Sequence, residues 1–157
     1  MDAFTEVSPD VSILTEIGKP YLQPKGDRHL FVRRGNTCSL DSFEHELIMV
    51  VRETGGLVVF TGCSHRGILN MVDAVSRQFD GLPMRAVFGG FHLMGLPILN
   101  TMAGSKGEVE GIGKEILKYP IEKIFTGHCT TAKGYRVLKR VLGGKLEYLP
   151  TGSGIEI

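Results

Sequence analysis

The chain has 157 residues, a length typical of one domain, and its 42% hydrophobic and 22% charged residues are ordinary for a globular protein. A net charge of +1 argues against nucleic-acid or membrane-surface binding built on electrostatic attraction. No apolar run approaches the about 20 residues of a membrane span. Three cysteines without a Cys-x-x-Cys pair, behind a polar N-terminus, predict a cytoplasmic protein without a disulfide framework.

The N-terminal third predicts few regular elements. We expect residues 1–28 to be mostly connection, with one strand at 11–17. A short strand at 30–32 leads into a turn with two positive charges, Arg33 and Arg34, which we interpret as a solvated face rather than a contact for an anionic substrate. Residues 46–52 predict the next strand, and a glycine turn returns into the strand at 57–61, so this pair is expected to be antiparallel.

From residue 57 the pattern changes to alternating strands and helices. The later strands are expected at 85–89, 122–126 and 145–149, with a last short strand after Gly154. Helices with apolar stripes are expected at about 67–79, 107–118 and 131–142. This alternation predicts an α/β fold with helices packed on a sheet. The apolar segment 93–104, broken by Gly and Pro, is expected to be a substrate lip or a contact surface.

Three of the strands end in glycine and then histidine, which places His65, His92 and His128 at equivalent positions. If these strands are parallel neighbours, the three imidazoles converge on the sheet edge where open α/β sheets bind ligands. Imidazole is the commonest metal ligand in proteins, and three suit Zn, Fe, Mn or Ni. We therefore predict a metal site at this edge. His29 and His45 lack the strand–glycine context and are expected to be surface or packing residues.

Residues beside His65 offer further chemistry. Cys63 is a candidate ligand or nucleophile, although a small buried thiol is the favoured interpretation. The free N–H groups at the helix start near Gly67, helped by Arg66, are a candidate phosphate site. Together with Ser64, Cys63 and Arg66 form the predicted substrate or phosphate contacts. The segment is neither a Gly-x-Ser-x-Gly nucleophile elbow nor a P-loop.

The three histidine motifs together resemble the metallo-β-lactamase superfamily. They are Thr61-Gly62-Cys63-Ser64-His65-Arg66-Gly67, Gly89-Gly90-Phe91-His92 and Thr126-Gly127-His128-Cys129. The resemblance is strongest to metal-dependent hydrolases and 7,8-dihydropterin-6-methyl-4-(β-D-ribofuranosyl)aminobenzene-5′-phosphate synthase-like proteins. It implies that the first and last of these histidines are metal ligands, whereas His92 stands where most of the superfamily has a bridging aspartate. It also implies a divalent transition metal, zinc first and iron or manganese next, and hydrolysis of esters or phosphoesters.

The superfamily signature His-x-His-x-Asp-His is absent from the chain. The resemblance covers about residues 10–157 and corresponds to the C-terminal half of an αββα sandwich. It implies one domain over residues 1–157, built as a mixed β-sheet with helices on one face. We expect such a half-sandwich to be incomplete or weakly active alone, with its metal partly or wholly absent.

The second face of such a sheet should be apolar and therefore covered. We expect a homodimer or a separately encoded N-terminal-half chain as the cover, with a small-molecule substrate if the domain is active. The alternative is a non-catalytic dimerisation or partner-binding module that has kept the histidines. A third idea, from the branch name, is binding of aryl ribose phosphates near Arg66.

Overall fold

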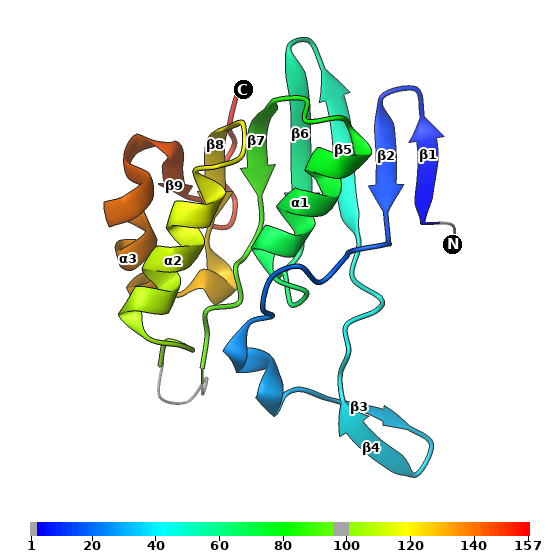
Figure 1. Ribbon diagram of the computed structural model, residues 1–157, viewed down its shortest axis with the longest axis vertical. Coiled ribbons are helices and arrows are strands. Elements are labelled where there is room, and N and C mark those ends of the chain that lie inside the picture. The colour runs from blue at the N-terminus through cyan, green and yellow to red at the C-terminus, as the bar shows by residue number, and fades with distance from the viewer. Residues whose placement is uncertain (1–2, 96–100) are drawn as a thin grey trace.

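A computed structural model describes residues 3–95 and 101–157 as a sheet covered by helices on one side (Figure 1). The main sheet has seven strands in the order β1-β2-β5-β6-β7-β8-β9. In chain order these are β1 (Phe4–Ser8), β2 (Val11–Leu14), β5 (Ile48–Glu53), β6 (Gly56–Thr61), β7 (Met84–Phe88), β8 (Ile121–Thr126) and β9 (Leu146–Tyr148). The pairs from β1 to β6 are antiparallel and those from β6 to β9 are parallel. The predicted mixed α/β sheet and the antiparallel β5–β6 pair are confirmed.

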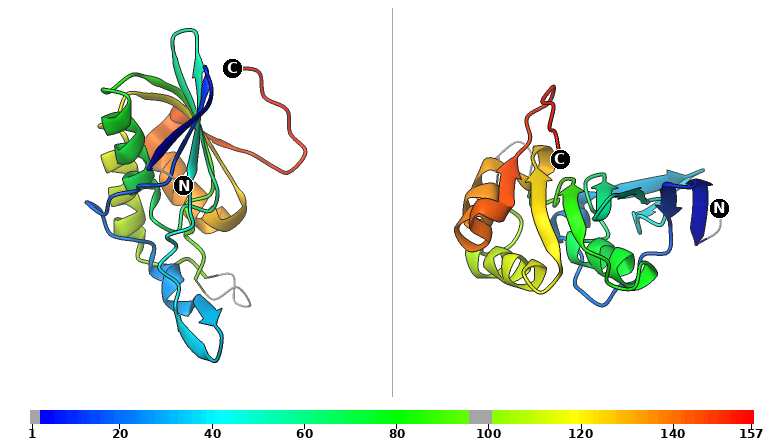
Figure 2. Two further views of the ribbon diagram at one scale, coloured as in Figure 1. Left: turned by 90° about the vertical axis from the view of Figure 1, so that its right-hand side faces the viewer. Right: turned by 90° about the horizontal axis from the view of Figure 1, so that it is seen from above.

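Three helices of equal length lie on the same face of the sheet, as the view from above shows (Figure 2). They are α1 (Ile68–Gln78), α2 (Lys106–Ile116) and α3 (Ala132–Leu142). Each connects two parallel strands, and this requires a crossover rather than a hairpin. Ser105 and Glu108 close a capping box at the start of α2, and the Thr131 hydroxyl accepts from the Gly134 N–H in α3. The three helices predicted from the apolar periodicity of the sequence are therefore confirmed.

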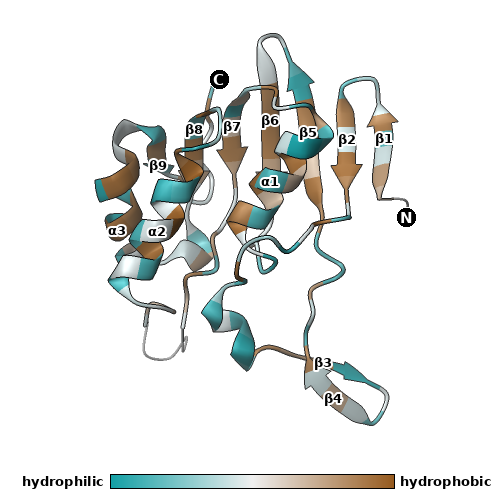
Figure 3. Ribbon diagram, viewed as in Figure 1, coloured by the Kyte–Doolittle hydropathy of each residue, from teal (hydrophilic) through white to brown (hydrophobic). Residues whose placement is uncertain are grey.

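The main core fills the space between this face and the helices. Its fully buried side chains come from alternate positions of the strands and from the inner stripes of the helices, and include Ile48, Leu57, Val59, Met71, Met84, Ile124 and Leu138. The apolar colour runs along the central strands in Figure 3. The apolar runs of the parallel strands are continuous because the alternate residues Val58, Ala86 and Phe125 point to the second face of the sheet and are buried as well.

The second face of the sheet carries a smaller apolar group. Val58, Ala86 and Phe125 are buried there and pack against half-buried neighbours that include Phe60 and Phe88. The three phenylalanines come from adjacent strands and stack in a row, with ring centroids 5.0 Å and 4.7 Å apart. Among the described residues no helix covers this row; only the C-terminal tail passes on that side (Figure 2).

A two-stranded hairpin, β3 (Phe31–Arg34) and β4 (Thr37–Leu40), projects from the body (Figure 1). Most of its side chains are exposed, as expected for the turn around Arg33 and Arg34. A short 3-10 helix, η1 (Lys25–His29), leads into it. Among the described strands, β3 and β4 pair only with each other, so the hairpin is not part of the main sheet.

Two expectations about the chain ends are wrong. No strand follows Gly154, since the chain after Tyr148 turns away at Pro150, which has no N–H to continue the ladder. The first 28 residues are also more regular than expected, because β1 pairs with β2 as an edge strand despite its half-exposed, weakly patterned sequence. Of the segment 93–104, residues 96–100 lie outside the described residues, and the flanking Met94 and Met102 form an isolated bridge.

No helix within the described ranges is both long and apolar enough to cross a bilayer.

Candidate metal centre

The three strand-end histidines follow neighbouring parallel strands at one edge of the sheet. His65 follows β6, His92 follows β7, and His128 begins the 3-10 helix η3 (His128–Thr130) after β8. His92 and His128 have positive φ angles of 41° and 46°, as does Ser64 at 58°. Left-handed backbone at non-glycine residues costs free energy and concentrates at functional sites. The edge is therefore conformationally unusual as well as rich in histidine.

The structure brings two of these histidines together with an aspartate that the sequence did not single out. Oδ1 of Asp27 lies 2.8 Å from Nδ1 of His65 and 3.4 Å from Nε2 of His92. The candidate ligand atoms of the three residues all lie within 4.8 Å of one another. Their side chains are 13%, 16% and 12% exposed, so the group is shielded yet reachable from solvent.

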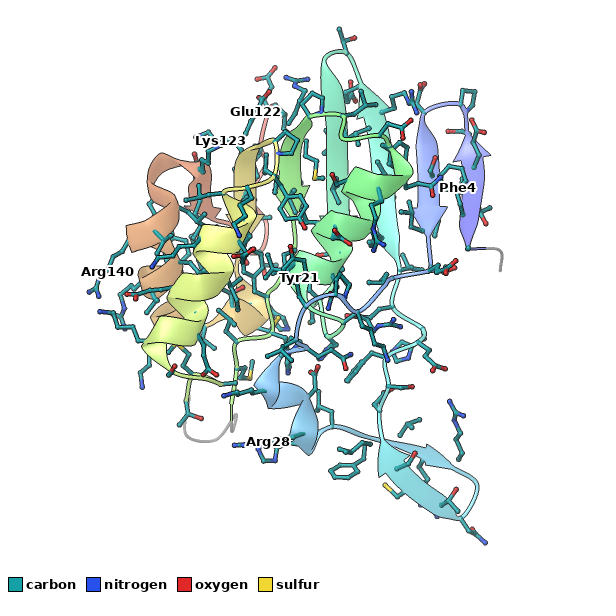
Figure 4. All side chains as sticks on the ribbon, in the orientation of Figure 1. Phe4, Tyr21, Arg28, Glu122, Lys123 and Arg140 are labelled. Carbon is teal, nitrogen blue, oxygen red and sulfur yellow. The ribbon has the colours of Figure 1, made fainter. Side chains whose placement is uncertain are left out.

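The segment before η1 is tied to the helices, and this places Asp27. The N–H of Tyr21 donates to Oδ1 of Asn70 in α1, and the Asn70 amide donates back to the Tyr21 carbonyl. Tyr21 lies beside α1 and α2 (Figure 4). Its hydroxyl is 3.0 Å from that of Tyr119. Gly26 permits the final approach, since a Cβ there would overlap the Met94 carbonyl oxygen and lie 3.0 Å from His92.

Burial and charge favour the neutral imidazole of His92. Burial lowers the pKa of His92 first, and the positive form of His65 lowers it further, against the opposing effect of Asp27. Phe43 stacks on the His65 ring with centroids 4.1 Å apart and planes 3° from parallel. Neutral imidazole is the form that binds metals.

Two buried polar atoms of the cluster have no hydrogen-bond partner among the described residues: Oδ2 of Asp27 and Nδ1 of His92. Buried polar atoms are almost always satisfied, so two orphans in one cluster call for an explanation. A carboxylate with two imidazoles is a donor set for zinc, iron or manganese. The residues present therefore fit a divalent metal.

Several polar groups of residues 64–66, just before α1, are already hydrogen-bonded within the protein. The N–H groups of His65 and Arg66 donate to the Glu46 carboxylate at 2.8 Å and 2.7 Å. The Arg66 guanidinium is buried and donates to the Ile17 carbonyl oxygen. Ser64 is fully buried, 2.9 Å from the Thr61 hydroxyl. Glu46 thus binds the two N–H groups just before the helix start, and the contact of Ser64 and Arg66 with substrate or phosphate stays a prediction.

His128 lies outside the Asp27–His65–His92 group. It is exposed and lines a cavity of about 560 Å³ that opens at the same edge, together with Cys63, Gly90 and Tyr148. Its charge still contributes to the lowered pKa of His92, so the two rings share one region of the molecule. The assignment of all three histidines as metal ligands stays a prediction.

Sequence reasoning missed Asp27, Phe43 and Glu46. They lie 38, 22 and 19 positions before His65, Asp27 and Phe43 in segments without helical or strand periodicity and Glu46 at the start of the strand predicted over 46–52. The available signal was the turn at Gly26, where a glycine allows close approach of two backbones.

The fold is that of a metallo-β-lactamase-like domain. The crystal structure of Tm1679, described as a metal-dependent hydrolase of the β-lactamase superfamily, superposes with a TM-score of 0.78 at 31% identity. The match covers all of this chain and 57% of that one. The chain therefore has a metal-dependent hydrolase-like fold, and the predicted similarity to the metallo-β-lactamase superfamily is confirmed.

A curated relative points to the same branch. The 7,8-dihydropterin-6-methyl-4-(beta-D-ribofuranosyl)-aminobenzene-5'-phosphate synthase of Methanocaldococcus jannaschii is 34% identical over 118 residues. The match covers 74% of this chain and 37% of the relative, so the chain spans less than two thirds of either protein. No family model matches the chain.

Proposed function

We propose that the chain is a metal-dependent hydrolase domain that acts on ester or phosphoester bonds of a small molecule. The observation that carries this proposal is the shielded group of Asp27, His65 and His92, with unpaired buried atoms on two of its members. The hydrolase-like fold supports the reaction class. Zinc is the metal we expect first, and iron or manganese next, because the donor set is a carboxylate with two imidazoles.

The chain's own residues hold and orient the centre. The contact with Asp27 fixes the ring plane of His65, and Phe43 covers one face of that ring. The Glu46 carboxylate accepts a hydrogen bond from the His65 N–H and so fixes the backbone at His65. A metal bound here supplies the Lewis-acid charge that hydrolysis of an ester or phosphoester requires.

The open cavity beside this centre is the proposed entry for substrate. Cys63 and His128 line it, so we assign His128 to substrate contact or, after a loop shift, to the third histidine ligand predicted from the sequence. The name of the Methanocaldococcus relative adds aryl ribose phosphates as a substrate class to test. Since the chain spans about half of Tm1679 and lacks His-x-His-x-Asp-His, we expect weak activity alone.

The metal proposal is tested by elemental analysis after incubation with Zn²⁺, Mn²⁺ or Fe²⁺ and removal of free ions. We expect close to one ion per chain, and a several-fold loss in Asp27→Asn. His45→Asn is the matched control, because His45 is 70% exposed and outside the group. Hydrolysis of bis-p-nitrophenyl phosphate by the loaded chain tests the reaction. Wild type that retains no ion, or Asp27→Asn that retains as much as wild type, would contradict the proposal.

A second candidate function rests on the row of stacked phenylalanines on the open sheet face. A non-catalytic dimerisation or partner-binding module would use this face and keep the histidines without turnover. In either function we propose that the face is covered by a second copy of the chain, and failing that by a separate chain equivalent to an N-terminal half. A cytoplasmic location remains part of the proposal.

Native mass spectrometry tests whether a second chain covers the open face of the sheet. We expect a dimer that Phe88→Glu converts to monomer, because the charge would stand between Phe60 and Phe125. Leu117→Glu is the control, since Leu117 is an exposed apolar residue on the helix side. A stable monomer without aggregation would contradict a buried face. A dimer without metal would favour the non-catalytic module.

A further inference from the structure

Two thiols meet at the same edge of the sheet without a role in the proposed metal centre. Cys63 follows β6 and Cys129 lies in η3 after β8, 66 positions apart in the chain. Between them passes Gly90, in the loop after β7. These three loops also hydrogen-bond to one another, since the Gly90 N–H donates to the Gly62 carbonyl oxygen at 2.9 Å.

The contact between the two cysteines is close. Sγ of Cys129 lies 3.6 Å from the carbonyl oxygen of Cys63, and the Cys63 thiol is a hydrogen-bond neighbour of the Cys129 thiol. A Cβ on Gly90 would overlap Sγ of Cys129 and lie 3.4 Å from Cα of Cys63. A disulfide joins Cα atoms roughly 4.4–6.8 Å apart. The absent side chain of Gly90 therefore leaves the two cysteines adjacent, and a bond between them requires their Cα atoms to lie within that range.

The two thiols differ in access. Cys63 is half-buried and lines the open cavity of about 560 Å³, whereas Cys129 is 2% exposed. A small oxidant that enters the cavity thus reaches Cys63 before the buried Cys129.

We propose that Cys63 and Cys129 form a reversible intramolecular disulfide when the chain meets a peroxide. The Cys63 sulfur attacks one peroxide oxygen, the O–O bond breaks, and the products are Cys63 sulfenic acid and water. The Cys129 sulfur then attacks the Cys63 sulfur, the S–O bond breaks, and a second water leaves with the thiol proton. A dithiol reductant returns both thiols. The bond ties the loop that carries His65 to the loop that carries His128.

The test uses hydrogen peroxide on the full chain in a Cys38→Ser background. Cys38 is exposed in the projecting hairpin, so its replacement removes the most exposed thiol, through which two chains would cross-link. We expect the two remaining thiols to disappear together, the intact mass to fall by two hydrogen atoms, and a peptide linking Cys63 to Cys129 to appear. Dithiothreitol should restore both thiols.

Single variants separate the two steps. In Cys129→Ser, Cys63 should take up oxygen and no intramolecular link should form. In Cys63→Ser, whose changed side chain is half-buried and easily accommodated, Cys129 should stay a free thiol under the same peroxide. The proposal is overturned if peroxide leaves both thiols free in the Cys38→Ser chain, or adds oxygen to Cys63 as it does without Cys129.

Discussion

The ends of β6 and β7 and the end of β8 carry the same motif and have different surroundings. At the first two, Asp27 and Phe43 reach over the edge, so His65 and His92 are shielded and share a carboxylate. At the third, no described segment does this, and His128 faces an open cavity. The difference shows that the strand–glycine–histidine pattern fixes where an imidazole stands, whereas a distant segment decides whether it becomes part of a centre.

Replacing the two equivalent histidines, His92 and His128, should produce the largest difference between variants, and that difference is in zinc affinity. Both His92 and His128 have left-handed backbone, which asparagine tolerates, so His92→Asn and His128→Asn isolate the side chain. We expect the zinc affinity to fall at least about 100-fold, roughly 2.7 kcal/mol, for His92→Asn. His128→Asn should change it less than about two-fold. Isothermal titration calorimetry measures both, and equal losses would show that His92 and His128 belong to one centre.

Blocking the approach of η1 to this edge of the sheet should have the next largest effect. Gly26→Ala sets a methyl group against the Met94 carbonyl and beside His92, so we expect a loss of about 1–3 kcal/mol in the free energy of unfolding. Gly107→Ala is the control, because its Cβ meets no atom within 4 Å and lies in a helix. Urea unfolding compares them. If Gly26→Ala is as stable as wild type, η1 does not pack on the edge as described.

Removing the Phe43 ring that stacks on His65 should have a smaller effect than these changes. Phe43→Leu removes a stacked aromatic that is 6% exposed, so we expect a loss of about 1–2 kcal/mol in stability together with weaker zinc binding. Phe31→Leu, at a position 59% exposed in the hairpin, should stay within about 0.5 kcal/mol of wild type. Thermal unfolding and a zinc titration give both quantities, and indistinguishable variants would argue against a role for the stack.

The smallest expected effect is a pH dependence. The pKa of His92 is lowered in the folded chain, so the unfolded chain binds the extra proton first. Stability from this residue is therefore full above the unfolded value of 6.5 and declines as the pH falls below it. Denaturant unfolding from pH 7.5 to 5.5 should give a shallower decline in His92→Asn than in wild type. An unchanged slope would mean that His92 titrates normally.

The sequence predicted the parts of the fold that depend on local pattern. The β5–β6 pair and the three helices were predicted because strand and helix periodicities and glycine turns are encoded within each segment. The weakly patterned edge strand β1 was missed, since its place depends on pairing with β2 rather than on its own residues. The expected strand after Gly154 failed for the converse reason, because no neighbour pairs with that segment in the described chain.

The candidate site was predictable only in part. His65 and His92 could be placed from their strand ends, because neighbouring parallel strands bring equivalent positions together. Asp27 could not, because its contact with His65 spans 38 positions and depends on Tyr21 and Asn70 anchoring the segment before it. Contacts between an irregular segment and a sheet edge leave no periodic signal in the sequence.

Anomalous diffraction at the zinc absorption edge, from crystals of the zinc-loaded chain, tests the central claim most directly. We expect one peak within coordination distance, about 2.0–2.2 Å, of atoms from Asp27, His65 and His92. A peak in the cavity beside Cys63 and His128 with none at Asp27, or no peak at this edge, would contradict the account.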